Sequence, residues 1–167
     1  MKDLTELVIG IVALNGGTMV GKTRLQKTLY LLESAGLGAG IDFDYHHYGP
    51  YSAEVVSATD FAMMSDRLGA EEKPGYHEVP YTVFSTNEKA PNRVGSMSAD
   101  AAREKLALLD SYSALELEIA ATILYVEKAG LSADPIEVVK RLKPLKATSK
   151  RIERAQKLIA GLGPSVA

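Results

Sequence analysis

The sequence contains no cysteine and no tryptophan, and it has only three histidines among 167 residues. The absence of cysteine excludes disulfides and thiolate metal sites. No run of about 18 apolar residues occurs, so no segment is expected to span a membrane. The first residues turn acidic early and are periodic, which predicts no signal peptide. These features favour a cytoplasmic globular protein, and 46% hydrophobic residues suffice for a core.

Charge is distributed unevenly along the chain. Residues 1–139 contain 11 Lys and Arg against 20 Asp and Glu, whereas residues 140–167 contain 8 against 1. A basic tail of this kind indicates either an anionic partner or docking of the tail on the acidic body or on a second copy. Lys150, Arg154 and Lys157 are spaced by four and three residues, which places them on one face of a helix.

Apolar periodicity predicts a largely helical chain. Ser113 with Glu116 forms a capping box, and Asp134 followed by Pro135 is a strong helix start. Gly130 is expected to end the helix that precedes it. Helices are therefore expected over residues 4–14, 21–35, 53–68, 98–110, 114–128, 135–143 and 149–161.

β-structure is predicted to be small. Residues 41–48 favour a strand that ends at a Gly49-Pro50 turn, after which Ser52 caps a helix. Residues 76–79 and 81–84 also favour strands, and Pro80 between them restricts them to an edge hairpin or a bent strand. The Glu71/Glu72 region and residues 87–97 are expected to be loops.

The fold class follows from this order of elements. It is mainly α with a small antiparallel β element (α+β). Residues 1–90 are expected to form a winged-helix-like core. Residues 98–167 are expected to form a helical extension that packs on this core within one structural domain.

Polar and aromatic residues concentrate between Lys22 and Ser52. Basic residues crowd the first turns of the second helix, where they oppose the helix dipole unless a carboxylate or an anion lies nearby. Tyr45, Tyr48 and Tyr51 recur every third residue and either fill the core or face a partner. We predict an interaction surface made of residues from this region and from the C-terminal helix: Lys22, Arg24, Gln26, Lys27, Tyr48, Tyr51, Lys150, Arg154 and Lys157.

Residues 16–23 also match the P-loop pattern G-x-x-x-x-G-K-[ST]. In this alternative, Gly16 and Gly21 shape a phosphate-binding loop, Lys22 reaches the outer phosphates and Thr23 holds Mg²⁺. A P-loop follows a buried parallel strand, but residues 4–12 have helical periodicity. A glycine-rich turn between two helices is the simpler interpretation, and nucleotide binding stays the alternative function.

Signals for catalytic and metal sites are weak. His46 and His47 are adjacent, so on a strand they point to opposite faces. Asp42, Asp44 and His46 share a face, which suits a hard cation but equally a solvated strand. We therefore expect no metal, no cofactor and no catalytic residues, and hence a protein that is not an enzyme.

Two motifs carry a resemblance to a known family: Lys22-x-Arg-Leu-Gln-Lys-x-Leu-Tyr-Leu-Leu and Phe43-x-Tyr-x-x-Tyr-Gly-Pro-Tyr-Ser. Together with the segments 115–125 and 139–144, they make the chain similar to the YwgA-type family of uncharacterised small proteins. The chain more distantly resembles the Panacea, or SocA-like antitoxin, domain. Members of that group are associated with toxin–antitoxin pairs and adaptor roles, and they carry no known catalytic site.

The residues and the resemblance together predict a macromolecular interaction module that is antitoxin-like or regulatory and forms a homodimer. Its partner is expected to be a protein or a nucleic acid. Phosphate contacts to DNA make affinity fall steeply with salt, whereas a protein interface depends more on aromatic anchors.

Overall fold

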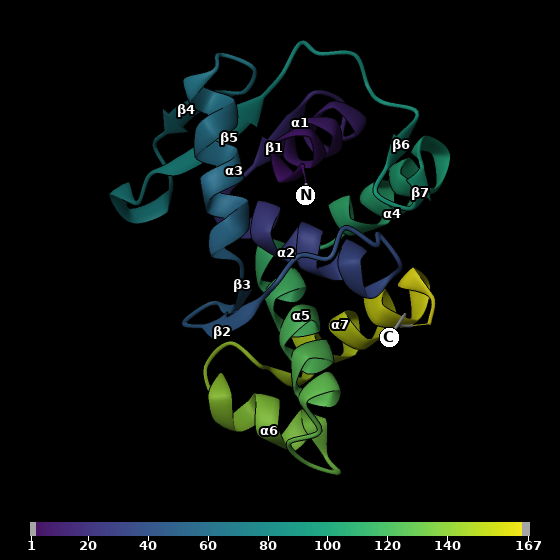
Figure 1. Cartoon of the computed structure of the whole chain (residues 1–167). Coiled ribbons are helices and arrows are strands. Elements are labelled where there is room, and N and C mark those ends of the chain that lie inside the picture. Colours follow the sequence, from purple (N-terminus) through teal and green to yellow (C-terminus); the bar gives the residue numbers. More distant parts are fainter. Residues whose placement is uncertain (1–2, 165–167) are drawn as a thin grey trace.

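The computed structural model describes residues 3–164. Within this range the chain forms seven α-helices and seven short strands, which confirms the predicted α+β class (Figure 1). The helices are α1 (Leu4–Leu14), α2 (Lys22–Ser34), α3 (Ala53–Met64), α4 (Ala99–Asp110), α5 (Ala114–Ala129), α6 (Pro135–Leu142) and α7 (Ser149–Leu162). The strands are β1 (Thr18–Val20), β2 (Asp44–His46), β3 (Gly49–Tyr51), β4 (Gly69–Lys73), β5 (Tyr81–Ser85), β6 (Arg93–Val94) and β7 (Met97–Ser98).

The first half of the chain combines three helices with short antiparallel strands, and its description as a winged-helix-like core stays a prediction. Helices α1, α2 and α3 are combined with an antiparallel sheet of order β1-β5-β4. Met19 on β1 lies opposite Phe84 on the central strand, and Glu71 on β4 lies opposite Val83. Met19 and Phe84 are both buried, so this face of the sheet packs into the core.

The second half is built around α5, which contacts α2, α6, α7 and β3 (Figure 1). Most residues of α5 from Leu117 to Val126 are buried. Helix α4 contacts α1, α2 and α7, so the two halves also meet there. One continuous apolar cluster runs from α1 to α7. The segments 3–90 and 98–164 therefore share a core across the α2–α5 and α1–α4 contacts.

Side-chain caps fix most of the helix starts. The side chains of Asp3, Ser52, Ser98, Asp134 and Thr148 each accept a hydrogen bond from the backbone N–H three residues later. These bonds satisfy N–H groups that have no partner within the helix. The predicted capping box of Ser113 and Glu116 is present, and Gly130 ends α5 in the left-handed conformation.

The predicted strand over residues 41–48 and the predicted turn at Gly49-Pro50 both differ in the structure. Strand β2 covers only Asp44–His46, and the tight turn lies at residues 47–48. Gly49-Pro50, which the sequence predicts as a turn, instead lies in β3 opposite Tyr45 and His46. Proline is tolerated there because β3 pairs with a single neighbour, so its missing N–H costs no ladder bond.

Other strands were missed because local preference does not reveal them. β1 lies inside the glycine-rich segment that matches a P-loop, and β4 contains Glu71 and Glu72 in a region expected to be loop. Both strands form by pairing with β5, and the charged β4 is exposed throughout. Residues 76–78 form a 3₁₀ turn instead of a strand. Residues 87–97 contain the short pair β6–β7 within the expected loop.

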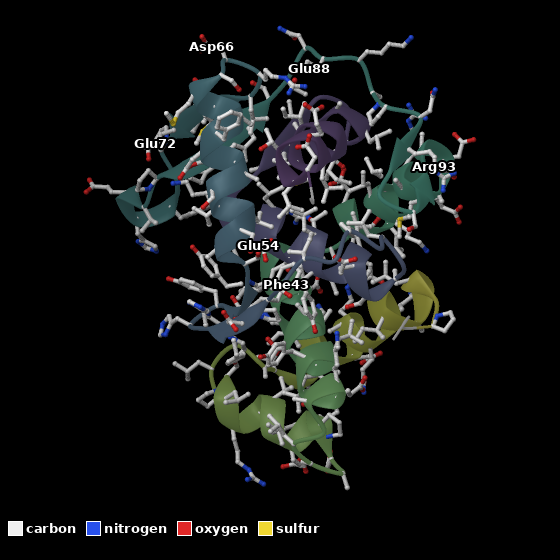
Figure 2. All side chains as sticks on the ribbon, viewed as in Figure 1. Phe43, Glu54, Asp66, Glu72, Glu88 and Arg93 are labelled. Atoms are coloured by element: carbon white, nitrogen blue, oxygen red, sulfur yellow. The ribbon has the colours of Figure 1, made fainter. Side chains whose placement is uncertain are left out.

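Figure 2 shows Glu54 on α3 and Glu72 on β4, with Asp66 in the turn between these elements and Arg93 at the opposite edge of the view, near α4. Among the described residues, no helix is both long enough and apolar enough to cross a membrane.

The β2–β3 hairpin lies directly against α5 at Gly49. Gly49 has a φ of +95°, and a Cβ atom there would lie 3.0 Å from Thr122 Oγ1 and 3.5 Å from Lys27 Cε. Gly130 also has a positive φ, +64°, but nothing lies within 4 Å of its Cβ position. An alanine at Gly130 would therefore cause backbone strain alone, whereas an alanine at Gly49 would cause both backbone strain and crowding against α5.

We expect Gly49→Ala to lower the free energy of unfolding more than Gly130→Ala. Backbone strain alone costs Gly130→Ala about 1 kcal/mol. Gly49→Ala adds crowding against Thr122, for a total of about 2–4 kcal/mol. Urea unfolding of both variants measures the difference, and equal losses would show that the hairpin can move away from α5 at little cost.

Candidate functional site: a pocket between α2 and α3

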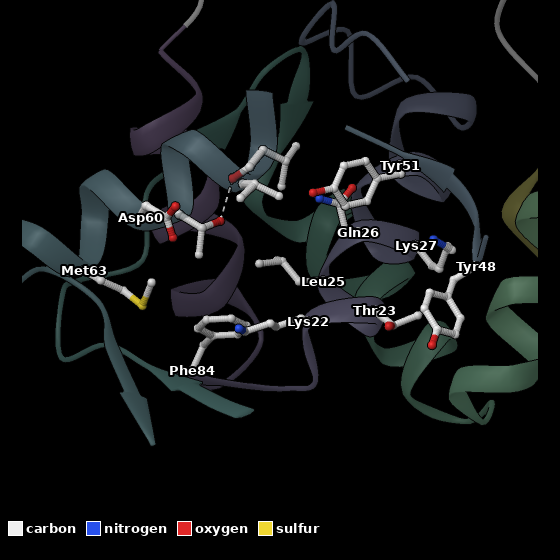
Figure 3. A pocket seen from close by; sticks show the side chains of 13 residues that line it. Lys22, Thr23, Leu25, Gln26, Lys27, Tyr48, Tyr51, Asp60, Met63 and Phe84 are labelled. Carbon is white, nitrogen blue, oxygen red and sulfur yellow. Dashed lines mark hydrogen bonds between the residues drawn. The ribbon is translucent and has the colours of Figure 1, made fainter. Parts of the chain in front are cut away.

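A pocket of about 280 Å³ opens between α2 and α3 (Figure 3). Helix α2 forms one wall, α3 forms another, and the β2–β3 hairpin and β5 close the ends. The lining is Lys22, Thr23, Leu25, Gln26, Lys27, Tyr48, Tyr51, Val55, Val56, Thr59, Asp60, Met63 and Phe84.

The pocket brings together five residues of the predicted interaction surface. Lys22, Gln26 and Lys27 come from α2, and Tyr48 and Tyr51 come from the hairpin. Sequence reasoning reached these residues through the two linked motifs. It predicted a helix over residues 53–68 and did not see that Val55, Val56 and Met63 on this helix also line a pocket. The apolar spacing on α3 is the same for both roles, so the sequence held no signal for the pocket itself.

Gln26 is an internal residue, not an exposed contact. Its Nε2 donates to the Ser52 carbonyl at 3.0 Å, and its Oε1 accepts from the Ser52 N–H at 2.8 Å. Both residues are buried. Ser52 in turn caps α3 by accepting from the Val55 N–H at 3.3 Å. Gln26 therefore fixes the point where the hairpin ends and α3 begins.

Lys27 is also buried, with only 1% of its surface exposed. Its Nζ donates to the Pro50 carbonyl at 2.7 Å. Burial lowers the pKa of Lys27 to about 8, although the nearby Glu118 carboxylate opposes this shift and Lys143 and Lys146 add to it. The expected carboxylate partner of this basic helix start is thus present within the chain.

Glu118 on α5 forms ion pairs with two lysines of the basic tail. Lys143 Nζ lies 2.8 Å from Glu118 Oε2, and Lys146 Nζ lies 3.2 Å from the same oxygen. Glu118 and Lys143 are both buried. This cluster ties α2, α5 and the segment after α6 together, and none of its members except Lys27 was singled out from the sequence.

The three tyrosines of the hairpin divide between core and surface. Tyr45 is half-buried, and its ring centroid lies 5.6 Å from that of Tyr125 on α5. Burial raises the pKa of Tyr45. Tyr48 is 54% exposed and stacks under Lys146, whose Nζ lies 4.7 Å from the ring centroid. Tyr51 is half-buried at the pocket wall.

The remaining predicted contact residues lie outside the pocket. Arg24 donates to the carbonyls of Tyr112 at 2.7 Å and Leu109 at 3.4 Å, where it complements the C-terminal end of α4. Arg154 Nε lies 2.9 Å from Glu116 Oε2, and its guanidinium stacks 4.2 Å from the Tyr112 ring. These two cations are used within the chain, which corrects their assignment to an open surface. Lys150 and Lys157 are exposed on α7.

The P-loop pattern has a different geometry from a phosphate-binding loop. The helix α1 precedes it, and residues 18–20 within it form β1. The Gly17 N–H donates to the Val12 carbonyl at 3.0 Å, and the Gly21 N–H donates to the Thr82 carbonyl at 2.7 Å. A phosphate cradle needs such N–H groups free to face the ligand. This geometry disfavours nucleotide binding at Lys22 and Thr23.

The two histidines of the β2–β3 hairpin, His46 and His47, contact tyrosine rings and are not arranged as metal ligands. His46 packs on Tyr51 with ring centroids 4.5 Å apart, and His47 lies against Tyr48. Within residues 3–164 no group of three or more His, Asp or Glu side chains is arranged to hold a metal ion.

Comparison with known proteins shows a distant similarity to an uncharacterised protein. No protein-family model matches the chain. The chain is similar to the uncharacterised protein YwgA of Bacillus subtilis (strain 168), with 26% identity over 115 residues. The match covers 68% of this chain and 69% of that protein. It confirms the predicted resemblance to YwgA-type proteins, whereas the likeness to the Panacea domain, the homodimer and the cytoplasmic location stay predictions.

We expect Gln26→Ala to destabilise the fold by about 2–4 kcal/mol, because it leaves the buried N–H and carbonyl of Ser52 without their partner. The matched control is Gln156→Ala, which removes an exposed glutamine from α7 and is expected to change stability by less than about 0.5 kcal/mol. Urea unfolding monitored by circular dichroism measures both. A loss for Gln26→Ala as small as that of the control would contradict the buried role.

The lowered pKa of Lys27 leads us to expect a specific pH dependence of the free energy of unfolding. Its pKa is about 8 in the folded chain against an ordinary value of 10.5, so the unfolded chain binds more protons between these pH values. The free energy of unfolding of the wild type should therefore rise from pH 8 toward pH 10.5 relative to Lys27→Met. Lys157→Met, at an exposed position, should give a curve parallel to the wild type. Parallel curves for all three proteins would exclude the lowered pKa.

Proposed function

We propose that the chain is a protein-interaction module of regulatory or antitoxin-like type and that it is not an enzyme. Its α2–α3 pocket receives an apolar side chain of a partner protein. The observation that carries this proposal is the composition of the lining. Leu25, Val55, Val56, Met63 and Phe84 supply apolar walls next to the half-buried Tyr51.

The size of the pocket suits a side chain better than a cofactor. Sites for drug-sized ligands and cofactors are typically about 300–1,000 Å³. The pocket here is about 280 Å³, just below that range. One large apolar side chain with its flanking backbone is a better match for this space than a dinucleotide.

The two buried polar side chains of the pocket, Gln26 and Lys27, also support binding over catalysis. Gln26 is used in two hydrogen bonds to Ser52, and the Lys27 amine donates to the Pro50 carbonyl. A general acid or base must reach the reacting atom, which side chains committed to the backbone do poorly. Their role here is to hold the walls of the pocket in place.

The charge on α3 favours a protein partner over DNA. In helix-turn-helix proteins the second helix of the motif enters the major groove, and lysine and arginine contact the phosphates. In this chain α3 occupies that position in the element order, and its sequence AEVVSATDFAMM has two acidic residues and no lysine or arginine. A duplex would meet repulsion at this helix.

The proposal is tested with side-chain mimics as probes. We expect the N-acetyl amides of leucine, methionine and phenylalanine, at millimolar concentration, to shift the amide resonances of Leu25, Val55 and Phe84 in ¹H–¹⁵N spectra. Val56→Phe fills the pocket from its own wall and should abolish the shifts. Ser57→Phe adds the same ring at an exposed neighbouring position on α3 and should leave them.

Two results would count against this function. Shifts that persist in Val56→Phe, or that appear with none of the three amides, would remove the pocket as the binding site. A labelled random-sequence DNA duplex provides the second arm. Tight binding of the duplex at about 50 mM salt, lost at about 200 mM, would assign the chain to nucleic acid instead.

A further inference from the structure

Opposite charges line the α2–α3 pocket beside its apolar walls. Lys22 comes from α2 and Asp60 from α3, and both residues are exposed (Figure 3). Within residues 3–164 neither side chain makes a hydrogen bond or an ion pair. We call Lys22 and Asp60 the rim charges of the pocket. Because the chain itself does not use them, they are available to a ligand.

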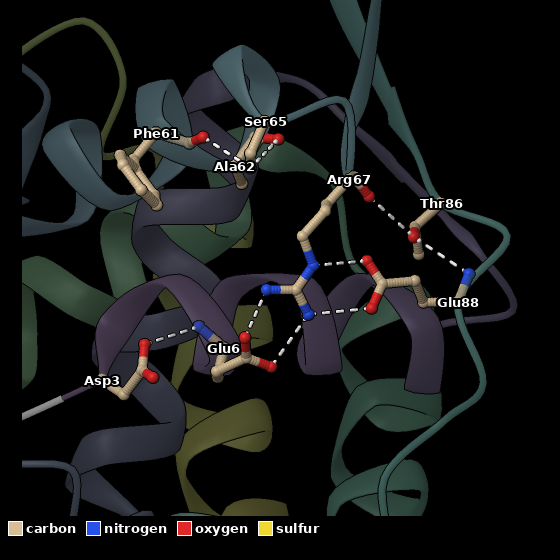
Figure 4. A network of polar contacts seen from close by, with 8 residues as sticks. All are labelled: Asp3, Glu6, Phe61, Ala62, Ser65, Arg67, Thr86 and Glu88. Atoms are coloured by element: carbon tan, nitrogen blue, oxygen red, sulfur yellow. Dashed lines mark hydrogen bonds and ion pairs between the residues drawn. The ribbon is translucent and has the colours of Figure 1, made fainter.

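Lys22 differs in this respect from three other basic side chains of the first half of the chain. Arg24 and Lys27 of the same helix donate to backbone carbonyls. Arg67, in the turn between α3 and β4, pairs with two glutamates (Figure 4). Lys22 is also the first residue of α2, where the helix dipole attracts negative charge. The pocket lining therefore contains a cation that lacks a counter-ion within the described part of the chain.

Buried lysines add positive charge next to the pocket. Lys27 lines the pocket and is buried, and the charges of Glu118, Lys143 and Lys146 act on it. These three lysines stand against one carboxylate, which leaves an excess of two positive charges. The two rim charges cancel each other, so the pocket lies in a positive field. Buried charges are screened less than charges in water, and the field therefore favours an anionic group inside the pocket.

The pocket has room for one amino-acid residue. Its volume of about 280 Å³ lies just below the range of drug-sized sites, about 300–1,000 Å³. The β2–β3 hairpin and β5 close its ends, so it is not a groove along which a peptide continues in both directions. A chain end leaves such a site in one direction only. The last residue of a protein also carries a carboxylate next to its side chain, which matches an apolar pocket in a positive field.

We propose that the pocket binds the C-terminal residue of the partner protein, with its apolar side chain against the pocket walls and its free carboxylate at Lys22. This inference rests on the proposed function, and it adds which part of the partner enters. Asp60 supplies an acceptor for the peptide N–H of the same residue. Capture of a terminal carboxylate is an established mode of peptide recognition. A charge-assisted hydrogen bond is about twice as strong as a neutral one, so Lys22 distinguishes a chain end from an internal residue.

Two leucine derivatives that differ only at the carboxyl group test the inference. N-acetyl-leucine mimics a C-terminal residue, and N-acetyl-leucine amide mimics an internal one. In ¹H–¹⁵N titrations of the full-length protein, we expect the acid to bind about threefold more tightly than the amide or better, because an exposed lysine gives a modest but measurable ion pair. Both compounds should shift Leu25 and Val55, and the acid should shift Lys22 and Thr23 more than the amide does.

Lys22→Met should reduce the preference for the acid to less than about twofold and leave the affinity for the amide nearly unchanged. The matched control is Lys157→Met, which removes an exposed lysine from α7 and should keep the preference. Equal effects of the two substitutions would place the carboxylate away from Lys22 and overturn the inference. Thermal unfolding of each variant confirms that it is folded.

A longer probe separates a chain end from a small acid. An acetylated Gly-Gly-Leu peptide with a free C-terminus should bind at least as tightly as N-acetyl-leucine, and its C-terminal amide should bind more weakly. Loss of affinity on adding the two glycines would mean that the pocket excludes a polypeptide chain. Free leucine that binds about threefold more tightly than N-acetyl-leucine would assign the rim charges to a zwitterionic amino acid. Either result would overturn the chain end as the ligand.

The outcomes also separate this inference from the function on which it rests. A preference for the acid below about threefold, with both compounds blocked by Val56→Phe, would sustain the pocket and overturn the chain end. Binding of the acid that persists in Val56→Phe would overturn the pocket as the binding site. The absence of shifts with either compound would overturn both proposals.

Discussion

Two consecutive buried polar side chains of α2 hold the site together. Gln26 bonds both backbone groups of Ser52, and Lys27 bonds the carbonyl of Pro50. A helix interior has no free backbone groups to offer a neighbouring strand, so the bond between α2 and β3 has to come from side chains. Because Ser52 also caps α3, the same contacts set where that helix begins. The wall of the pocket formed by α3 thus depends on the register of the Gln26–Ser52 pair.

Burying Lys27 has a cost that the rest of the fold offsets. A buried ammonium is destabilising unless it is paired and hydrogen-bonded. Here Glu118 of α5 attracts it, and the same carboxylate takes Lys143 and Lys146 from the basic tail. The cluster joins both halves of the chain at one place, beneath the hairpin. Three cations around one carboxylate are a poor way to maximise stability, and we infer that the arrangement serves to fix a single docking of the hairpin and tail.

The sequence predicted the helices well because their starts are encoded locally. Asp3, Ser52, Ser113 and Asp134 are caps that need only their own helix. It failed where a strand exists only because β5 pairs with it, as in the charged β4. It also placed Gln26 and Lys27 on the surface, because amphipathic reasoning gives a helix one buried face. Helix α2 contacts β1, β3, α4 and α5, so all its residues from Leu25 to Leu32 are buried. The two motifs contact each other in space, because Gln26 bonds Ser52 and Lys27 bonds Pro50. This contact explains why both motifs occur together in the chain, and no local sequence pattern shows the contact.

The charge asymmetry of the chain is also reinterpreted by the structure. From composition, the basic tail looks like the part that meets an anionic partner. In the structure Lys143 and Lys146 pair with Glu118, and Arg154 pairs with Glu116. These positive charges of the tail are therefore paired within the chain. In the first half of the chain Arg67 pairs with Glu6 and Glu88. Residues 1–90 contain 12 Asp and Glu against 7 Lys and Arg, and a net negative charge opposes binding to nucleic acid. The distribution of charge, more than the order of the elements, therefore supports the proposal of a protein partner.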